Sequence, residues 1–81
     1  MRRSIDHGFD DHPEDDDERP RAAWAVAIAE DCDGCADMRV VITVEEQGRP
    51  GSGLALHLAP DTARRLRIAM ADALKELGQQ P

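Results

Sequence analysis

Aromatic residues, cysteines and long apolar runs are scarce in this chain. Its 81 residues include one Trp, one Phe, no Tyr and two Cys. Two cysteines are too few for the disulfide framework of a small secreted domain. There is no run of about 18 apolar residues to cross a membrane, and the opening letters MRRSID lack the apolar stretch of a secretory signal. We therefore expect a cytoplasmic protein that makes no contact with a membrane.

The sequence also lacks the common catalytic motifs. It contains no Gly-x-x-x-x-Gly-Lys, no Gly-x-Ser-x-Gly and no His-Glu-x-x-His. Glu45 and Glu46 are neighbours in a predicted strand, so they point to opposite faces and do not form an acid and base couple. Because a small folded part offers little concave volume for a substrate, we expect a protein that is not an enzyme.

Basic residues are outnumbered by acidic ones. The chain has 17 acidic and 10 basic side chains and a formal net charge of -7. Proteins that bind nucleic acids usually carry a basic stripe, since much of their affinity comes from neutralising phosphates and releasing counterions. The charge balance argues against nucleic-acid binding and permits a basic protein partner.

Residues 1–21 differ in composition from the rest of the chain. They hold one Ile and one Phe beside eight acidic and four basic side chains, too little apolar surface to offset the entropy of ordering. We expect a disordered acidic arm over 1–21 and a single folded domain over 22–81. The densest acidic run includes Asp15, Asp16, Asp17 and Glu18, which are candidates for contact with a basic partner. A tail that only aids solubility is the alternative.

Three segments alternate between apolar and other residues with the period of a β-strand. They cover 22–29, 38–46 and 54–58, and short connections favour an antiparallel meander. Residues 48–53, with the letters GRPGSG, separate the last two strands with residues typical of turns. The expected sheet therefore has three antiparallel strands.

A helix is expected from about Pro60 to Leu77. Pro60 suits the first helical position, Asp61 suits the first turn, and Gly78 suits the residue after the helix. Its apolar residues form one stripe, which should pack on the apolar face of the sheet in an α+β fold of β-β-β-α order. The predicted core consists of Trp24, Val26, Ile28, Val40, Ile42, Val44, Leu54, Leu56 and Leu58 under Leu66, Met70, Leu74 and Leu77.

One helix cannot cover both faces of a sheet. The other face carries four alanines, Val41, Ala55 and His57, so a second chain could approach it closely. We expect a homodimer through that face or through a sheet edge. On the helix, Ile68 lies among Arg64 and Lys75 on the polar side and is a second candidate contact, although a single exposed Ile is common.

The segment Cys32-Asp33-Gly34-Cys35 is a C-x-x-C motif in the predicted loop between the first two strands. Two thiolates at this spacing can bind one Zn²⁺, but a structural site needs four ligands. His7 and His12 could complete it from the arm, or a dimer could pool two cysteine pairs, whereas His57 is expected to point away from the core. A disulfide or redox switch, or loop thiols without such a role, are the other interpretations.

These patterns favour a small accessory or regulatory protein that binds another protein, as a homodimer and without a cofactor. A zinc-binding or redox-responsive protein that uses Cys32 and Cys35 is the alternative.

Overall fold

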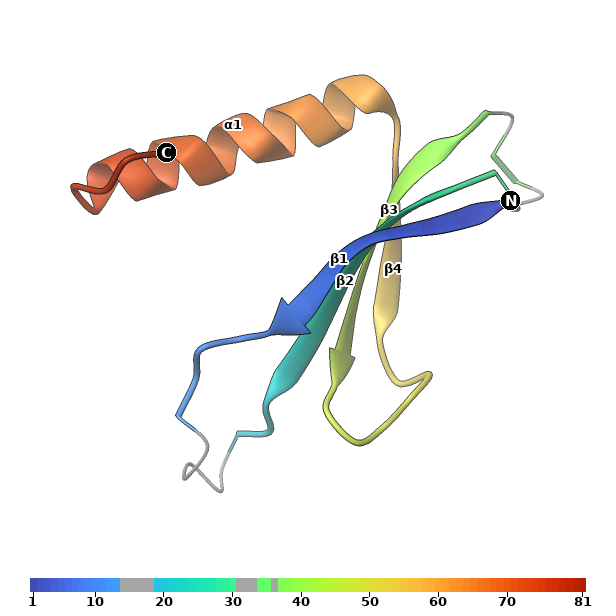
Figure 1. Ribbon diagram of the computed structural model, residues 1–81, viewed down its shortest axis with the longest axis horizontal. Helices are drawn as coiled ribbons and strands as arrows, with labels where there is room; N and C mark the ends of the chain where they lie inside the picture. Colours follow the sequence, from blue (N-terminus) through green and yellow to red (C-terminus); the bar gives the residue numbers. More distant parts are fainter. Residues whose placement is uncertain (14–18, 31–33, 36) are drawn as a thin grey trace.

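The computed structural model describes residues 1–13, 19–30, 34–35 and 37–81. These residues contain four strands, which are β1 (Arg2–Phe9), β2 (Ala22–Ala29), β3 (Arg39–Glu46) and β4 (Leu54–Leu58), followed by the helix α1 (Pro60–Glu76). The strands form one antiparallel sheet in the order β1-β2-β3-β4 (Figure 1). The prediction of an α+β fold with an antiparallel sheet and a C-terminal helix is confirmed.

The number of strands predicted from the sequence is wrong, because residues 2–9 form β1. The disordered arm predicted over 1–21 is not confirmed; the acidic residues 14–18 lie outside the described residues. β1 pairs with β2 from Arg2↔Ala29 to Phe9↔Ala23, with a register shift between Ser4 and Asp6. A strand at a sheet edge gains backbone hydrogen bonds with little burial of its own side chains, so a count of apolar residues does not detect it.

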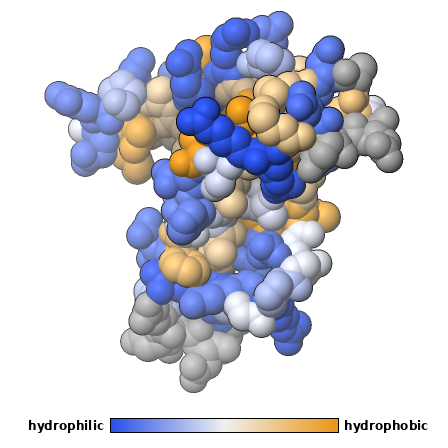
Figure 2. Space-filling view, turned by 45° about the vertical axis from the view of Figure 1, so that its right-hand side comes forward, coloured by the Kyte–Doolittle hydropathy of each residue, from blue (hydrophilic) through white to orange (hydrophobic). Residues whose placement is uncertain are grey.

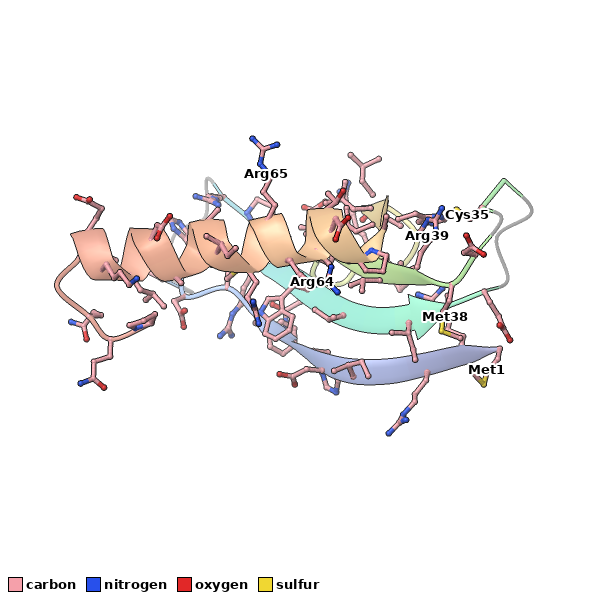
Figure 3. All side chains as sticks on the ribbon, turned by 90° about the horizontal axis from the view of Figure 1, so that it is seen from above. Met1, Cys35, Met38, Arg39, Arg64 and Arg65 are labelled. Atoms are coloured by element: carbon pink, nitrogen blue, oxygen red, sulfur yellow. The ribbon has the colours of Figure 1, made fainter. Side chains whose placement is uncertain are left out.

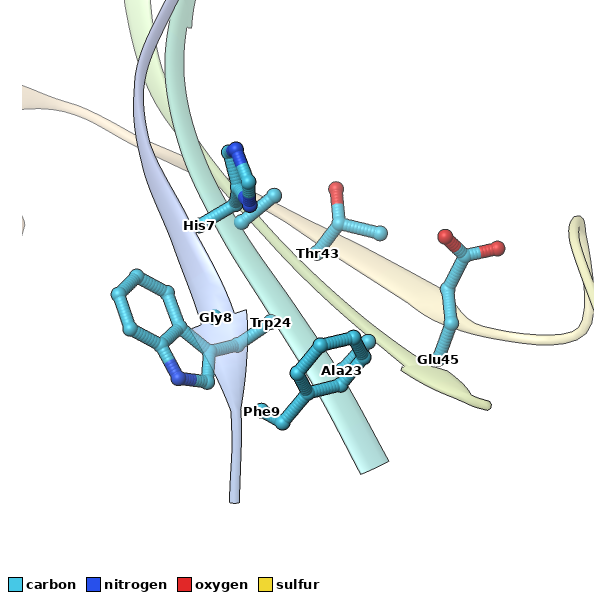
Figure 4. Close-up of a pocket in the computed structure, with 8 residues that line it drawn as sticks. His7, Gly8, Phe9, Ala23, Trp24, Thr43 and Glu45 are labelled. Carbon is cyan, nitrogen blue, oxygen red and sulfur yellow. The ribbon is translucent and has the colours of Figure 1, made fainter. Parts of the chain in front are cut away.

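A close contact holds β1 against β2. The ring of Trp24 lies against the backbone of Gly8, and a Cβ atom added at residue 8 would stand 2.9 Å from the ring (Figure 4). The guanidinium carbon of Arg21 also lies 5.0 Å from the centre of the Phe9 ring, a cation–π geometry. These contacts add aromatic packing to an edge strand that is otherwise polar.

The register gives the sheet two different faces. Trp24 pairs with Val44, Val26 with Ile42, and the members of an antiparallel pair share a face. The apolar face comprises Trp24, Val26, Ile28, Val40, Ile42, Val44, Leu54, Leu56 and Leu58. The alanine face comprises Ala23, Ala25, Ala27, Ala29, Arg39, Val41, Thr43, Glu45, Ala55 and His57.

The helix begins and ends at the residues that the sequence indicates. Pro60 occupies the first turn after Ala59, which is extended as the residue before a proline usually is. At the other end Gly78 has a φ of 77°, its N–H donates to Lys75, and the N–H of Gln79 donates to Leu74. This is a Schellman cap, which glycine allows because it lacks a Cβ.

The predicted packing of the helix on the sheet is wrong. α1 leaves the end of β4 and extends away from the sheet instead of lying along it (Figure 1), and it contacts only β3 and β4 among the elements. The residues of the predicted core are therefore exposed or only partly buried. Among the described residues, the buried apolar side chains are Ala27, Ala29 and Val41, all on the alanine face.

Candidate functional site

An open apolar groove lies in the angle between α1 and the sheet, with a volume of about 480 Å³. Both α1 and the sheet contribute side chains that the sequence pattern predicts to lie in the core. The groove residues are Val26, Val40 and Ile42 from the sheet and Ala63, Leu66, Arg67, Met70, Ala71, Leu74 and Pro81 from α1 and the C-terminus. It is open to solvent because α1 diverges from the sheet.

Apolar side chains continue beyond the groove in both directions. On the sheet Leu54 is 82% exposed and Leu56 is 53% exposed, and after the helix Leu77 is 75% exposed. Figure 2 shows hydrophobic residues at the surface of a molecule with a broad upper part and a narrower stem. We call the groove together with Val44, Leu54, Leu56 and Leu77 the open apolar surface. These exposed apolar side chains come from both the sheet and α1, whereas a soluble monomer usually exposes such residues singly.

The polar side of α1 carries the three helix residues proposed as contacts. Arg64 pairs with Asp61 one turn earlier, Ile68 is 52% exposed, and Lys75 lies in the last turn. None of the three lines the groove. Arg65 projects from the side of the helix in Figure 3. The polar side of α1 is therefore a second accessible surface, distinct from the groove.

The other predicted contacts differ in their accessibility. Asp15, Asp16, Asp17 and Glu18 lie outside the described residues. Val41, at 3% exposed, is buried within the chain. The alanine face around it offers less area to a partner than the sequence pattern indicates, because Ala27, Ala29 and Val41 are already covered.

Cys35 and His57 are brought together at one end of the alanine face. The Cys35 sulfur lies 3.5 Å from Nδ1 of His57, and His57 pairs with Val41 across β3 and β4. The sequence interpretation considered His7 and His12 as partners of the cysteines and set His57 aside. Strand alternation places His57 on the alanine face, but only the path of the β2–β3 connection brings Cys35 to that face.

The ligand set of a metal site is partial in the described part of the chain. Cys32 lies outside it, and no group of three or more His, Cys, Asp and Glu side chains there could hold a metal ion. Cys35 and His57 supply one thiol and one imidazole, two of the donor types that Zn²⁺ prefers. A metal at this position needs ligands beyond the two that the structure shows.

A smaller cavity of about 220 Å³ lies where β1, β2 and β3 meet, on the side of Thr43 and Glu45 (Figure 4). His7, Phe9 and Ala23 also line it. The Glu45 carboxylate accepts a hydrogen bond of 2.7 Å from the N–H of Gly51, in the connection between β3 and β4. This carboxylate stabilises the turn between β3 and β4.

Comparison with known proteins identifies no relative. No protein-family model matches the chain, and no similar protein was found among curated proteins or solved structures. Within the described residues, no helix has the length and apolar character needed to span a membrane.

Proposed function

We propose that this chain is a small interaction protein, without enzymatic activity, that binds another protein chain through the open apolar surface. The observation that carries the proposal is the groove between α1 and the sheet, where two apolar elements of one small chain stay uncovered. An accessory or regulatory role in the cytoplasm is consistent with this surface.

Apolar surface that stays in contact with water carries a free-energy cost. Burial is worth about 25 cal/mol for each Å² of apolar surface, so exposed leucine and methionine side chains are costly unless a partner covers them. Leu54 and Met70 are each more than half exposed; Met70 lines the groove on the helix side, and Leu54 lies on the apolar face of the sheet. A protein segment that presents apolar side chains matches both sides at once.

Site-specific photo-crosslinking tests this proposal in cells that produce the full chain. A photoreactive amino acid replaces Met70 in the groove, and the matched control replaces Ile68, which is similarly exposed but outside the groove. We expect a polypeptide adduct at position 70 that is several times more abundant than at position 68. Equal yields, or no adduct at position 70, would contradict the proposed surface.

A second candidate is a zinc-binding or redox-responsive protein that uses Cys32 and Cys35. The specific observation is the 3.5 Å contact between the Cys35 sulfur and Nδ1 of His57, which places an imidazole beside one of the two cysteines. In native mass spectrometry of protein purified with zinc, we expect a bound ion that is lost in Cys35→Ser and weakened in His57→Ala. His7→Ala is the matched control. An apo mass for the wild-type chain would eliminate the zinc role.

A further inference from the structure

The chain exposes far more surface than a compact protein of its mass. Its accessible area is 6622 Å², whereas a folded monomer of 8.9 kDa has about 4,800 Å² by the usual scaling with mass. Its radius of gyration is 14.7 Å, compared with about 12 Å for a compact domain of this length. This excess of about 1,800 Å², which includes polar as well as apolar area, is larger than the roughly 800 Å² that each partner buries in a standard interface.

The two exposed apolar parts match each other in kind and in length. A helix with an apolar stripe packs on an apolar sheet face. The 17 residues of α1 span about 26 Å, and the 8 residues of β3 span about the same length. Within one chain, the apolar stripe of α1 therefore has no sheet packed along it, and the apolar face of the sheet has no helix packed along it.

The connection between β4 and α1 prevents the chain from closing on itself. Only Ala59 separates Leu58 from Pro60, with φ of -64° and ψ of 158°. A residue before a proline is restricted to extended conformations, and Pro60 fixes the first helical turn. The direction of α1 is thus set at the end of β4, and the helix leaves Leu54 and Leu56 uncovered.

We propose that a second copy of this chain occupies the groove, with α1 of each copy packed on the apolar face of the other. This inference rests on the proposed function and names the partner of the same surface. A two-fold axis makes the contact reciprocal, so both helices and both sheet faces are covered in one closed dimer. The interface differs from the alanine face and the sheet edge expected from the sequence.

The other self-association surfaces are less suited to this role. One end of the alanine face is already buried within the chain, at Ala27, Ala29 and Val41. The β1 edge carries Arg2 and Arg3 and an irregular register, features that oppose pairing with another strand. Neither surface would cover the groove, whereas exchange of the helices would place an apolar helix over it.

Complementation between two variants tests the reciprocal contact. Met70→Asp damages the helix and Leu54→Asp damages the sheet face; both side chains are exposed, so the folded monomer tolerates the changes. In a homodimer of either variant both helix–sheet contacts are damaged. In a mixed dimer one contact combines the two damaged surfaces, and the other contact is intact.

We expect sedimentation at about 50 µM to give a wild-type mass twice that of the 8.9 kDa chain. Each variant alone should dissociate with a Kd on the order of tenfold higher or more, as at an interface hot spot. An equimolar mixture should recover dimer. Ile68→Asp, the matched control, should match the wild type, and circular dichroism should show that all variants are folded.

Several results would overturn the proposal. A wild-type mass of one chain excludes the dimer, and failure of the mixture to recover dimer excludes helix exchange. Dissociation by Ile68→Asp equal to that by Met70→Asp would place the interface on the polar side of α1. A monomeric mass with a photo-adduct from position 70 to a different protein overturns the second copy and leaves the proposed function intact. A monomer without such an adduct overturns both.

Discussion

At the scale of single residues, Gly8 and Trp24 explain how a polar segment becomes a strand. The Trp24 ring covers the Gly8 backbone, a packing that uses the missing side chain of the glycine. This contact lies on the apolar side of β1, whereas its Asp, Arg and His residues are largely in solvent. One aromatic contact and a ladder of backbone hydrogen bonds therefore hold an edge strand with little apolar surface.

The variant Gly8→Ala should lower the free energy of unfolding by about 1–3 kcal/mol, the usual cost of overpacking. The new Cβ would stand 2.9 Å from the Trp24 ring, so the ring or β1 must shift. Trp24, the only tryptophan, reports this shift by its fluorescence during urea unfolding. Ser4→Ala, at an exposed position of the same strand, is the control. Equal urea concentrations at the midpoint of unfolding for the two variants would refute the contact between Gly8 and Trp24.

At the scale of elements, the connection between β4 and α1 has the largest consequence. Residue patterns place both elements correctly, but the single residue between them determines where the helix points. A helix with this stripe would cover its own sheet if the chain could turn back. The short connection separates the two halves of a potential core, and a second copy can bring equivalent halves together.

Inserting about four Gly and Ser residues between Ala59 and Pro60 should convert dimer to monomer, because a flexible linker lets α1 fold back on its own sheet. The measurements are sedimentation for the mass and small-angle scattering for the radius of gyration. We expect the monomer to be more compact than the 14.7 Å of the present chain. The same insertion between Arg49 and Pro50, in the connection of β3 and β4, is the control.

Unchanged association after insertion at Ala59 would show that the connection does not control the partner of α1. A monomer that remains extended would show that the helix has no affinity for a sheet face.

At the scale of the whole molecule, net charge and apolar area act in opposite directions on self-association. Each copy carries a formal charge of -7, so two copies repel each other. Dissolved salt screens this repulsion. The open apolar surface provides the attraction, which salt does not weaken in this way. The dependence of association on salt therefore distinguishes a second copy from a basic partner.

The Kd of the homodimer should decrease several-fold when NaCl is raised from about 50 mM to about 500 mM, since the Debye length decreases from about 14 Å to about 4 Å. Sedimentation equilibrium at the two salt concentrations measures this change. A complex with a basic partner would show the reverse trend. An increase of the homodimer Kd with salt would indicate that ion pairs, rather than the apolar surface, hold the copies together.

Local sequence patterns correctly predict β2, β3, β4 and α1. Alternating residues, the GRPGSG turn, Pro60 and Gly78 are local signals, and local backbone preferences were sufficient to locate these elements. The sequence also determined which side chains share each face of the sheet, because strand alternation follows directly from the pleat.

Only the tertiary structure decided how these elements meet. β1 depends on backbone pairing across twelve intervening residues, from Phe9 to Ala22, and the Cys35–His57 contact depends on the path of a connection. The exposed groove depends on the direction in which α1 leaves Ala59. The periodicity of apolar residues indicates that the stripe on α1 must be buried. It gives no information on the direction in which the helix leaves the sheet, so it could not show which surface the stripe lies against.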